Sequence, residues 1–425
     1  MSIRLFHPSV ANFVQQVARS LHEAGQLERF VTTVRNDPAS PRQRAITALG
    51  QWLGRDLAAQ FHRRAITEIP LEKVETHPWG ELLRLAAGAI DRDGRLTDFI
   101  WEKTETGFDR RVARGLHRGL TGVYGYEHSS LATFQRAREL GLPVVYDVPA
   151  PEPRFVHALL GVEMEKFPEL RTAYHRHTAA REERRIARRR AEWHRANLIL
   201  VNSHFTKNSY ALAGLDCSRV RVATLGSPPP VPRDEALAAP GPSAPLTLIW
   251  AGTFSIRKGA HYLLEAWRIG NLGRHARLLV YGAMGIPERV LHPLPEGVEL
   301  RGSIARSDLL AQYRQADALI FPTLCDGFGL VATEAWSRGV PVIITDRAGA
   351  ADLLKPNHNG LLIRAGDPSA IVASVEWCHT HRTELRAMRE SALATATAWQ
   401  WSDYRKLHTE FLREAGLFSS SSAPR

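Results

Sequence analysis

The sequence predicts an α/β protein of two domains, each built on a doubly wound parallel sheet, with the domains facing a central cleft. The first observation is length, because 425 residues exceed what one ordinary core accommodates. The second is that short apolar runs alternate with segments of helical periodicity in both halves of the chain. The third is a proline-rich stretch without apolar periodicity at 226–245, which predicts a linker between the halves.

In the N-terminal half a strand, a helix and a strand follow one another at 2–8, 12–25 and 27–34, the order typical of a parallel sheet. Gly25 stands where the first helix would end. Further strands are predicted at 121–126, 142–149 and 196–203, with helices around 43–62, 80–90 and 131–141 and one long arginine-rich helix over about 165–195.

After the linker the alternation starts again, which predicts a second open parallel sheet. A final amphipathic helix is expected at 399–416 and would cross back to the first domain. The strands of the second half are predicted at 246–252, 276–282, 298–303, 317–323 and 340–346, and its helices at 260–269, 308–316 and 330–339. The predicted division is an N-terminal domain at 1–228, a linker at 229–245, a C-terminal domain at 246–398 and the last helix at 399–416.

Composition favours a cytoplasmic globular protein. The chain has 44% hydrophobic and 23% charged residues, no uninterrupted apolar run long enough to span a membrane, and a beginning unlike a signal peptide. Its three cysteines are too few and too scattered for a disulfide scaffold or a cysteine-rich metal site. Because Cys378, His379 and His381 lack a distant fourth ligand, no metal is expected there.

The net charge of +11 favours an anionic partner, and two interpretations stay open. One is a general bias toward arginine, in which the run at 181–195 partly neutralises itself through its glutamates. The other is contact with an anionic membrane or a lipid-diphosphate acceptor, which would place the protein at the periphery of the inner membrane face. Nucleic acid is not expected as a partner, because no nucleic-acid-binding module accompanies the charge.

The most informative stretch is PTLCDGFGLVATEAWSRGVPVI at 322–343. Asp326 precedes a Gly-Phe-Gly turn, and Glu334 follows eight positions later on a predicted helix. Gly327 and Gly329 would let the backbone approach a phosphate or a sugar oxygen closely, where the start of the helix adds positive potential. A plain strand–turn–helix with a solvated Asp326 is the alternative, since lone glycine motifs are weak signals.

This stretch resembles the signature of the family 4 retaining glycosyltransferases, which have the GT-B fold of two Rossmann-like domains. The family frame reads EGFGL…EA…G.PVI, so Asp326 stands at its first Glu and Glu334 at its second. The segment WAGTFSIRKGAHYLLEAW at 250–267 resembles the family's phosphate-binding segment. In it Lys258 matches the family's Lys, Thr253 stands where the family usually has Arg, and Arg257 offers a second cation.

The resemblance implies a glycosyltransferase that moves a hexose-like sugar from a nucleoside-diphosphate sugar to a saccharide or lipid-linked acceptor, as in polysaccharide biosynthesis. It also implies that fixed cations, without a metal or cofactor, stabilise the diphosphate leaving group. In keeping with this, no Asp-x-Asp pair follows a strand of the second domain. The implied catalytic residues are Asp326, Glu334 and Lys258, and the implied donor contacts are Thr253, Arg257, Gly302, Ser303, Ile304, Gly327, Phe328, Gly329 and Leu330.

The first domain is expected to bind the acceptor, and it departs from the family at two places. The turn HPSVANF at 7–13 lacks the usual glycine, which leaves Asn12 as the candidate on that side. The strand at 142–149 ends without the His that commonly follows it in the family. His128 and Asp147 are therefore the candidates for contact with the transferred sugar.

These departures leave open an alternative of a different class, a non-catalytic sugar-nucleotide-binding partner of a glycosyltransferase complex. An epimerase or a phosphorylase would share the fold, but a phosphorylase would need a cofactor-binding Lys and a far longer chain. A dinucleotide oxidoreductase is not expected, because no G-x-G-x-x-G follows either first strand.

Overall fold

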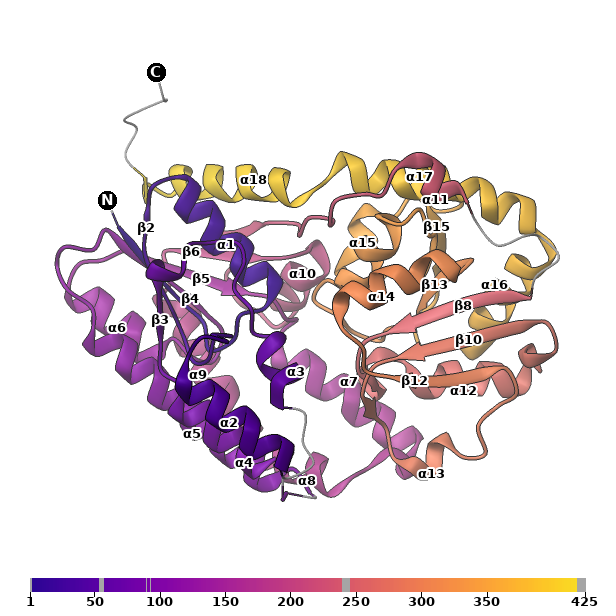
Figure 1. Ribbon diagram of the computed structural model, residues 1–425, viewed down its shortest axis with the longest axis horizontal. Helices are drawn as coiled ribbons and strands as arrows, with labels where there is room; N and C mark the ends of the chain where they lie inside the picture. The colour runs from indigo at the N-terminus through magenta and orange to yellow at the C-terminus, as the bar shows by residue number, and fades with distance from the viewer. Residues whose placement is uncertain (1, 53–56, 89, 92, 239–244, 419–425) are drawn as a thin grey trace.

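Two parallel sheets, one in each half of the chain, form the framework of the protein (Figure 1). The computed structural model describes residues 2–418 except 53–56, 89, 92 and 239–244. The seven-stranded N-terminal sheet has the order β3-β2-β1-β4-β5-β6-β7, and its strand pairs are parallel. Its strands are β1 (Ile3–Phe6), β2 (Leu27–Thr32), β3 (Val74–Thr76), β4 (Gly122–Tyr126), β5 (Val144–Val148), β6 (Leu198–Val201) and β7 (Val220–Val222).

The C-terminal half repeats this architecture. Its six-stranded sheet has the order β12-β10-β8-β13-β14-β15, again with parallel pairs, and a two-stranded sheet β11-β9 lies beside it. The fold class predicted from the alternation of strands and helices is therefore confirmed. The strands are β8 (Leu246–Ala251), β9 (Phe254–Ser255), β10 (Ala276–Tyr281), β11 (Met284–Gly285), β12 (Val298–Gly302), β13 (Ala318–Phe321), β14 (Val342–Thr345) and β15 (Gly360–Ile363).

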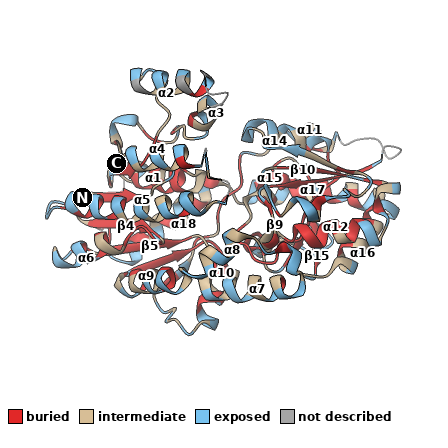
Figure 2. Ribbon diagram, turned by 90° about the horizontal axis from the view of Figure 1, so that it is seen from below, coloured by how far each residue is buried: buried red, intermediate tan, exposed pale blue. Residues whose placement is uncertain are grey.

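The central strands are buried along their whole length, because helices cover both faces of each sheet (Figure 2). This double cover explains why the strands read as continuous apolar runs and not as alternating ones. Where the strand order reverses, between β1 and β4 and between β8 and β13, the carboxyl ends of the strands border a crevice. Open α/β sheets bind their ligands at such points.

The helices of the N-terminal half begin with α1 (Asn12–Glu23), which ends before Gly25 as predicted, with Gly25 at φ +65°. The sequence did not predict α5, because polar and charged residues fill most of its positions and leave little periodicity. The other helices are α2 (Pro41–Trp52), α3 (Leu57–His62), α4 (Trp79–Ala87), α5 (Arg95–Arg114), α6 (Leu131–Glu139), α7 (Pro153–Lys166), α8 (Ala173–Ala179), α9 (Glu182–Arg195), α10 (His204–Leu212) and the 3-10 helices Leu71–Lys73 and Pro168–Leu170.

The prediction of one long arginine-rich helix over about 165–195 is wrong. Helix α7 ends at Lys166, since Pro168 has no amide hydrogen with which to continue it. Thr172 then starts α8, where its hydroxyl accepts a hydrogen bond from the amide of His175. Only α9 carries the dense arginine run, and it lies against α6.

The helices of the C-terminal half pack around its sheet in the same way. Of the predicted linker, 233–237 form the short helix α11, while 239–244 lie outside the described residues. The predicted domain boundaries stay a prediction. The helices are α11 (Arg233–Leu237), α12 (Ala260–Ile269), α13 (Glu288–Leu291), α14 (Arg306–Gln312), α15 (Leu330–Trp336), α16 (Pro368–Thr380), α17 (Arg382–Ala398) and the 3-10 helices Ile256–Lys258, Leu272–Arg274, Tyr313–Gln315 and Gly349–Leu353.

The last helix, α18 (Trp401–Glu414), returns to the N-terminal half, as predicted, where it packs along α1 (Figure 1). The Ser20 hydroxyl lies 2.9 Å from Nδ1 of buried His408, and Arg405 binds Glu23 and Gln16 of α1 at 2.9 and 2.6 Å. No helix in the described part of the chain is both long and apolar enough to cross a membrane.

Candidate active site

The loop 322–329 joins β13 to α15 at the carboxyl end of the C-terminal sheet, where the sequence places its main motif. Backbone bonds to the next loop hold it on both sides of Asp326. The Asp326 amide donates to the carbonyl of Arg347 at 2.8 Å, and the Asp326 carbonyl accepts from Gly349 at 3.1 Å. In the same pair of loops, the Ala350 amide donates to the carbonyl of Phe328 at 2.7 Å. Main-chain hydrogen bonds therefore hold the loop in place, independently of the contacts of its side chains.

Gly327 is the point at which this loop meets the N-terminal half. A Cβ at Gly327 would overlap the carbonyl oxygen of Pro149. The Gly327 carbonyl accepts hydrogen bonds from Ser203 Oγ at 2.6 Å and Thr206 Oγ1 at 3.2 Å. Ser203 also caps α10, because its hydroxyl accepts from the Thr206 amide at 3.0 Å. Sequence reasoning did not predict this link between the halves.

Gly329 turns the chain into α15 in the left-handed region, at φ +88°, with the ring of Phe321 against its Cα. A side chain would be strained at this φ and would collide with that ring. Leu330 begins the helix, and the first amides of a helix have no acceptor within it. The start of α15 therefore leaves hydrogen-bond donors at the edge of the loop.

The structure brings together three of the predicted residues, Lys258, Arg257 and Asp326. Lys258 forms an ion pair with the Asp326 carboxylate and lies over the Phe321 ring, 4.9 Å from its centre. Arg257 donates from Nη1 to the carbonyl of Cys325 at 2.9 Å. Burial and the neighbouring Arg257 lower the pKa of Lys258 well below its usual range. A partly buried pair of basic side chains thus lies beside the carboxylate of the loop.

Glu334, the second acid of the motif, lies on α15 in a different setting. It is 6% exposed and accepts a hydrogen bond from Arg306 Nε at 2.6 Å. Burial raises the pKa of Glu334, while Arg306 opposes the shift. The sequence did not single out Arg306. It lies 28 positions earlier, at the start of α14, and no local pattern links it to Glu334.

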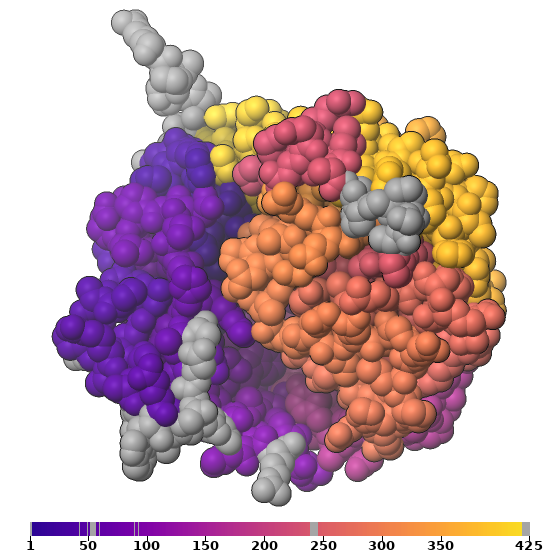
Figure 3. Space-filling view, turned by 45° about the vertical axis from the view of Figure 1, so that its right-hand side comes forward, coloured from indigo at the N-terminus to yellow at the C-terminus, as the bar shows by residue number. Residues whose placement is uncertain are grey.

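The end of β12 and the loop that follows it carry the residues predicted to hold the base of the donor. Gly302 is in the left-handed region at φ +70°, and its carbonyl accepts from Gly282 at 2.8 Å. Ser303 and Ala305 border a cavity of about 800 Å³ whose other walls come from α2, α3 and the loop before α2. The surface is hollowed between the two halves (Figure 3). Of the remaining predicted residues in this half, Thr253 is exposed before β9, and Ile304 packs on the core.

A second cavity, of about 340 Å³, connects Arg257 to the N-terminal half. Its other lining residues belong to the loops after β4 and β5 and to helices α7, α8 and α9. Among them Arg189 Nε lies 3.7 Å from a Glu127 carboxylate oxygen, and burial raises the pKa of Glu127. Sequence reasoning missed both residues, because nothing in the local pattern sets them apart from the surrounding charge.

The three candidates in the N-terminal half lie in separate places. Asp147 accepts from the Tyr124 hydroxyl at 2.7 Å, and the same hydroxyl lies 3.3 Å from Nε2 of His408 on α18. Burial raises the pKa of Asp147 to about 7. Asn12 starts α1, and its buried Nδ2 has no partner among the described residues. His128 stacks on Trp101, with ring centres 4.7 Å apart. Within the described part of the chain, no hydrogen bond, ion pair or ring contact joins these three to Lys258 or Asp326.

Among the described residues, no group of three or more His, Cys, Asp or Glu is placed to hold a metal ion. Independence from metal and cofactor stays a prediction.

Comparison with known proteins agrees with this architecture. The family described as Glycosyl transferases group 1 matches residues 245–381, which include Lys258, Asp326 and Glu334. A D-inositol 3-phosphate glycosyltransferase of Xylanimonas cellulosilytica is 32% identical over 181 residues, 37% of this chain and 42% of that protein. The capsular polysaccharide biosynthesis glycosyltransferase CapM of Staphylococcus aureus is 31% identical over 127 residues, 28% of this chain and 33% of that protein. The matches thus span less than half the length of these relatives.

Solved structures resemble the whole chain. Sucrose-phosphate synthase from Thermosynechococcus elongatus superposes with a TM-score of 0.65 at 18% identity, covering 99% of this chain and 100% of that one. HepE of Anabaena, in complex with UDP, gives a TM-score of 0.59 at 15% identity, covering 97% and 100%. The two parallel-sheet domains are therefore a GT-B fold. Together with the group 1 match in the C-terminal half, they support a glycosyltransferase.

Proposed function

We propose that this protein is a retaining glycosyltransferase of family 4 that transfers a sugar from a nucleoside-diphosphate sugar to a saccharide or lipid-linked acceptor without a metal ion. The observation that carries the proposal is the grouping of Lys258, Arg257 and Asp326 at the end of the C-terminal sheet, beside the start of α15. Cleavage of a glycosidic bond to a diphosphate leaves negative charge on the phosphate oxygens. Positively charged side chains beside the diphosphate stabilise that charge.

In this proposal the ion pair between Lys258 and Asp326 opens when the donor binds. Lys258 turns to the diphosphate, joined by Arg257, and the Asp326 carboxylate accepts hydrogen bonds from hydroxyls of the transferred sugar. The lowered pKa of Lys258 fits this role, because an adjacent diphosphate favours the charged amine that burial disfavours. Amides of Gly329 and Leu330 donate to the phosphate from the start of the helix.

Glu334 is proposed to bind the ribose hydroxyls of the donor. Its bond with Arg306 orients the carboxylate and opposes the rise in pKa that burial causes. The base of the donor would then lie along Gly302, Ser303 and Ile304, where backbone N–H and C=O groups can form hydrogen bonds with it.

UDP-sugars are the first donors to test. Among proteins of the same fold, HepE has been solved with UDP and with UDP-glucose. For the acceptor, a saccharide in polysaccharide biosynthesis is proposed, because CapM carries that description. Asn12, His128 and Asp147 stay candidates on the acceptor side.

A position at the inner face of an anionic membrane is part of the proposal, because it would bring a lipid-linked acceptor within reach. Trp79, Leu83 and Ile90 on or just after α4 are exposed by 69%, 62% and 77%. Exposed apolar side chains that are close together along the chain are typical of surfaces that contact a partner or a membrane.

The test is donor binding followed by turnover. The melting temperature is measured with UDP, GDP, ADP and their glucose conjugates, each with and without EDTA. A ligand at about a hundred times its Kd adds roughly 2.7 kcal/mol of stability. We expect one diphosphate series to stabilise the protein in EDTA and its sugar conjugate to be consumed when an acceptor is added.

Variants then test the named residues. Lys258→Gln and Glu334→Gln should each lower turnover by about a hundredfold or more, because each removes an interaction with the donor. Lys406→Gln on the exposed face of α18 is the matched control and should leave turnover unchanged. Stabilisation by a diphosphate without turnover on any acceptor would favour the non-catalytic sugar-nucleotide-binding alternative. Full activity of Lys258→Gln would contradict the mechanism.

A further inference from the structure

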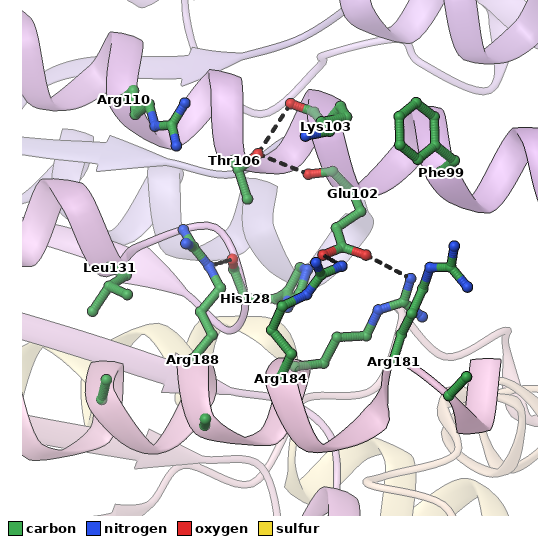
Figure 4. Close-up of a pocket in the computed structure, with 14 residues that line it drawn as sticks. Phe99, Glu102, Lys103, Thr106, Arg110, His128, Leu131, Arg181, Arg184 and Arg188 are labelled. Carbon is green, nitrogen blue, oxygen red and sulfur yellow. Dashed lines mark hydrogen bonds and ion pairs between the residues drawn. The ribbon is translucent and has the colours of Figure 1, made fainter. Parts of the chain in front are cut away.

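A large cavity in the N-terminal half is lined by none of the residues Lys258, Arg257 and Asp326, which carry the proposed function. It has a volume of about 880 Å³ and lies between α5 and α9 (Figure 4). That volume is in the range of sites for small molecules. Its lining residues carry an excess of cations, namely Lys103, Arg110, Arg181, Arg184, Arg185 and Arg188 against the single carboxylate of Glu102.

Three of these cations are already neutralised. Arg185 donates to Asp98 at 2.7 Å and to Glu102 at 3.0 Å. Arg188 pairs with Asp109, and Arg184 pairs with Glu102. These ion pairs hold α5 and α9 together and shape the walls of the cavity.

The other three cations have no carboxylate partner within the described part of the chain. Arg110 has no partner there, and Arg181 contacts only the carbonyl and ring of His177. Lys103 lies over the Phe99 ring, 5.6 Å from its centre. Three positive charges around one cavity therefore lack a counter-charge from the protein.

His128 is the second and independent observation. It is 3% exposed, lines the cavity, and both ring nitrogens lack a hydrogen-bond partner. The surroundings fix the residue firmly, because its amide donates to Glu192 at 2.7 Å, its carbonyl accepts from Arg188 at 2.6 Å, and its ring stacks on Trp101. Buried polar groups are normally paired, so an orphaned imidazole in a cationic cavity indicates a missing partner.

We propose that this cavity binds a ligand through a phosphate group, held by Lys103, Arg110 and Arg181 at the mouth and by the His128 ring at the back. Phosphate offers several acceptor oxygens and matches the fork of an arginine, and its negative charge balances the excess of cations. A neutral imidazole supplies one N–H to such a group. The half-exposed Phe99 borders the opening and would contact the organic part of the ligand. A free phosphorylated sugar and a phospholipid headgroup share this chemistry.

The experiment is done in the Lys258→Gln background, which removes the main cation of the donor site. Binding of inorganic phosphate and of glucose 6-phosphate is measured by calorimetry, and binding to phosphatidylglycerol vesicles by sedimentation. The test variant is Arg110→Gln/Arg181→Gln, which removes two cations without carboxylate partners. The control is Arg118→Gln/Arg413→Gln, which removes the same charge from exposed positions elsewhere.

We expect saturable binding that the test variant weakens at least tenfold and the control leaves unchanged. Binding of glucose 6-phosphate identifies a free phosphorylated ligand, and binding of vesicles alone identifies a headgroup. Upon binding, the NMR signals of the His128 ring should shift, which a general effect of charge would not produce. Absence of binding to all three probes, or equal affinity of test and control variants, would overturn the proposal. Because Lys258 is absent throughout, failure here leaves the proposed transfer reaction untouched.

Discussion

The two halves share an architecture but hold their polar residues in different ways. In the C-terminal half, Lys258 and Asp326 lie in the segments that follow strands β9 and β13, and glycines bring the backbone of those segments close to its neighbours. In the N-terminal half, charged residues meet between the long helices α5 and α9. The first arrangement depends on backbone geometry and the second on paired charges, so the two should respond differently to substitution.

The largest expected effect is on the charged helix pair. Asp98→Ala/Glu102→Ala leaves buried Arg185 without either of its carboxylate partners, and a buried charge that loses its partners costs about 3 kcal/mol or more. Urea denaturation followed by circular dichroism measures the loss. Glu139→Ala, which breaks a pair that is about half exposed, is the control and should change stability by less than about 1 kcal/mol. Equal losses in both variants would show that burial does not set the difference.

A smaller loss of stability, about 1–3 kcal/mol, is expected from Gly327→Ala, because the new Cβ must displace the carbonyl of Pro149. Its effect on catalysis should be the clearer one, since the loop carries Asp326. Activity with the identified donor and the urea midpoint are measured together. Gly161→Ala, within α7 and with open space at its Cβ, is the control and should be neutral or slightly stabilising. Wild-type activity in Gly327→Ala would mean that the contact between the halves is dispensable.

The smallest effect is a pH dependence at Asp147. Its pKa is about 7 in the folded protein and near 3.8 when unfolded, so the fold prefers the protonated form. The stability from this group is complete below pH 3.8 and is lost as pH rises toward 7, at up to 1.4 kcal/mol per unit, by order of magnitude. The asparagine of Asp147→Asn cannot ionise, so the variant does not lose this part of its stability as pH rises. Its stability relative to wild type should therefore rise by about 1 kcal/mol from pH 5.5 to 6.5, as read from urea midpoints. A constant difference would refute burial as the cause.

Much of the fold could be predicted because apolar strands and helical periodicity are local signals. The sequence implied that Lys258 and Asp326 lie near each other, because each belongs to a contiguous motif, at 250–267 and 322–343, assigned to the same donor site. The bonds of Arg306 to Glu334 and of Ser203 to Gly327 were not, since they join residues 28 and 124 positions apart. The breaks at Pro168 and Thr172 were missed because the arginine run dominated the pattern. Contacts between residues far apart in the chain produce no recognisable local pattern in the sequence.

The return of α18 determines where the two halves can pivot. The chain passes between them twice, before α11 and before α18, and the passages lie side by side. Ser227 donates to Trp399 at 3.0 Å and forms a bridge with Gln400, while the Trp399 indole donates to Thr224 at 3.1 Å. Gly226 is pressed against the backbone of Gln400, where no side chain fits. Because these two adjacent passages are bonded to each other, we expect any opening of the cleft to turn about that edge.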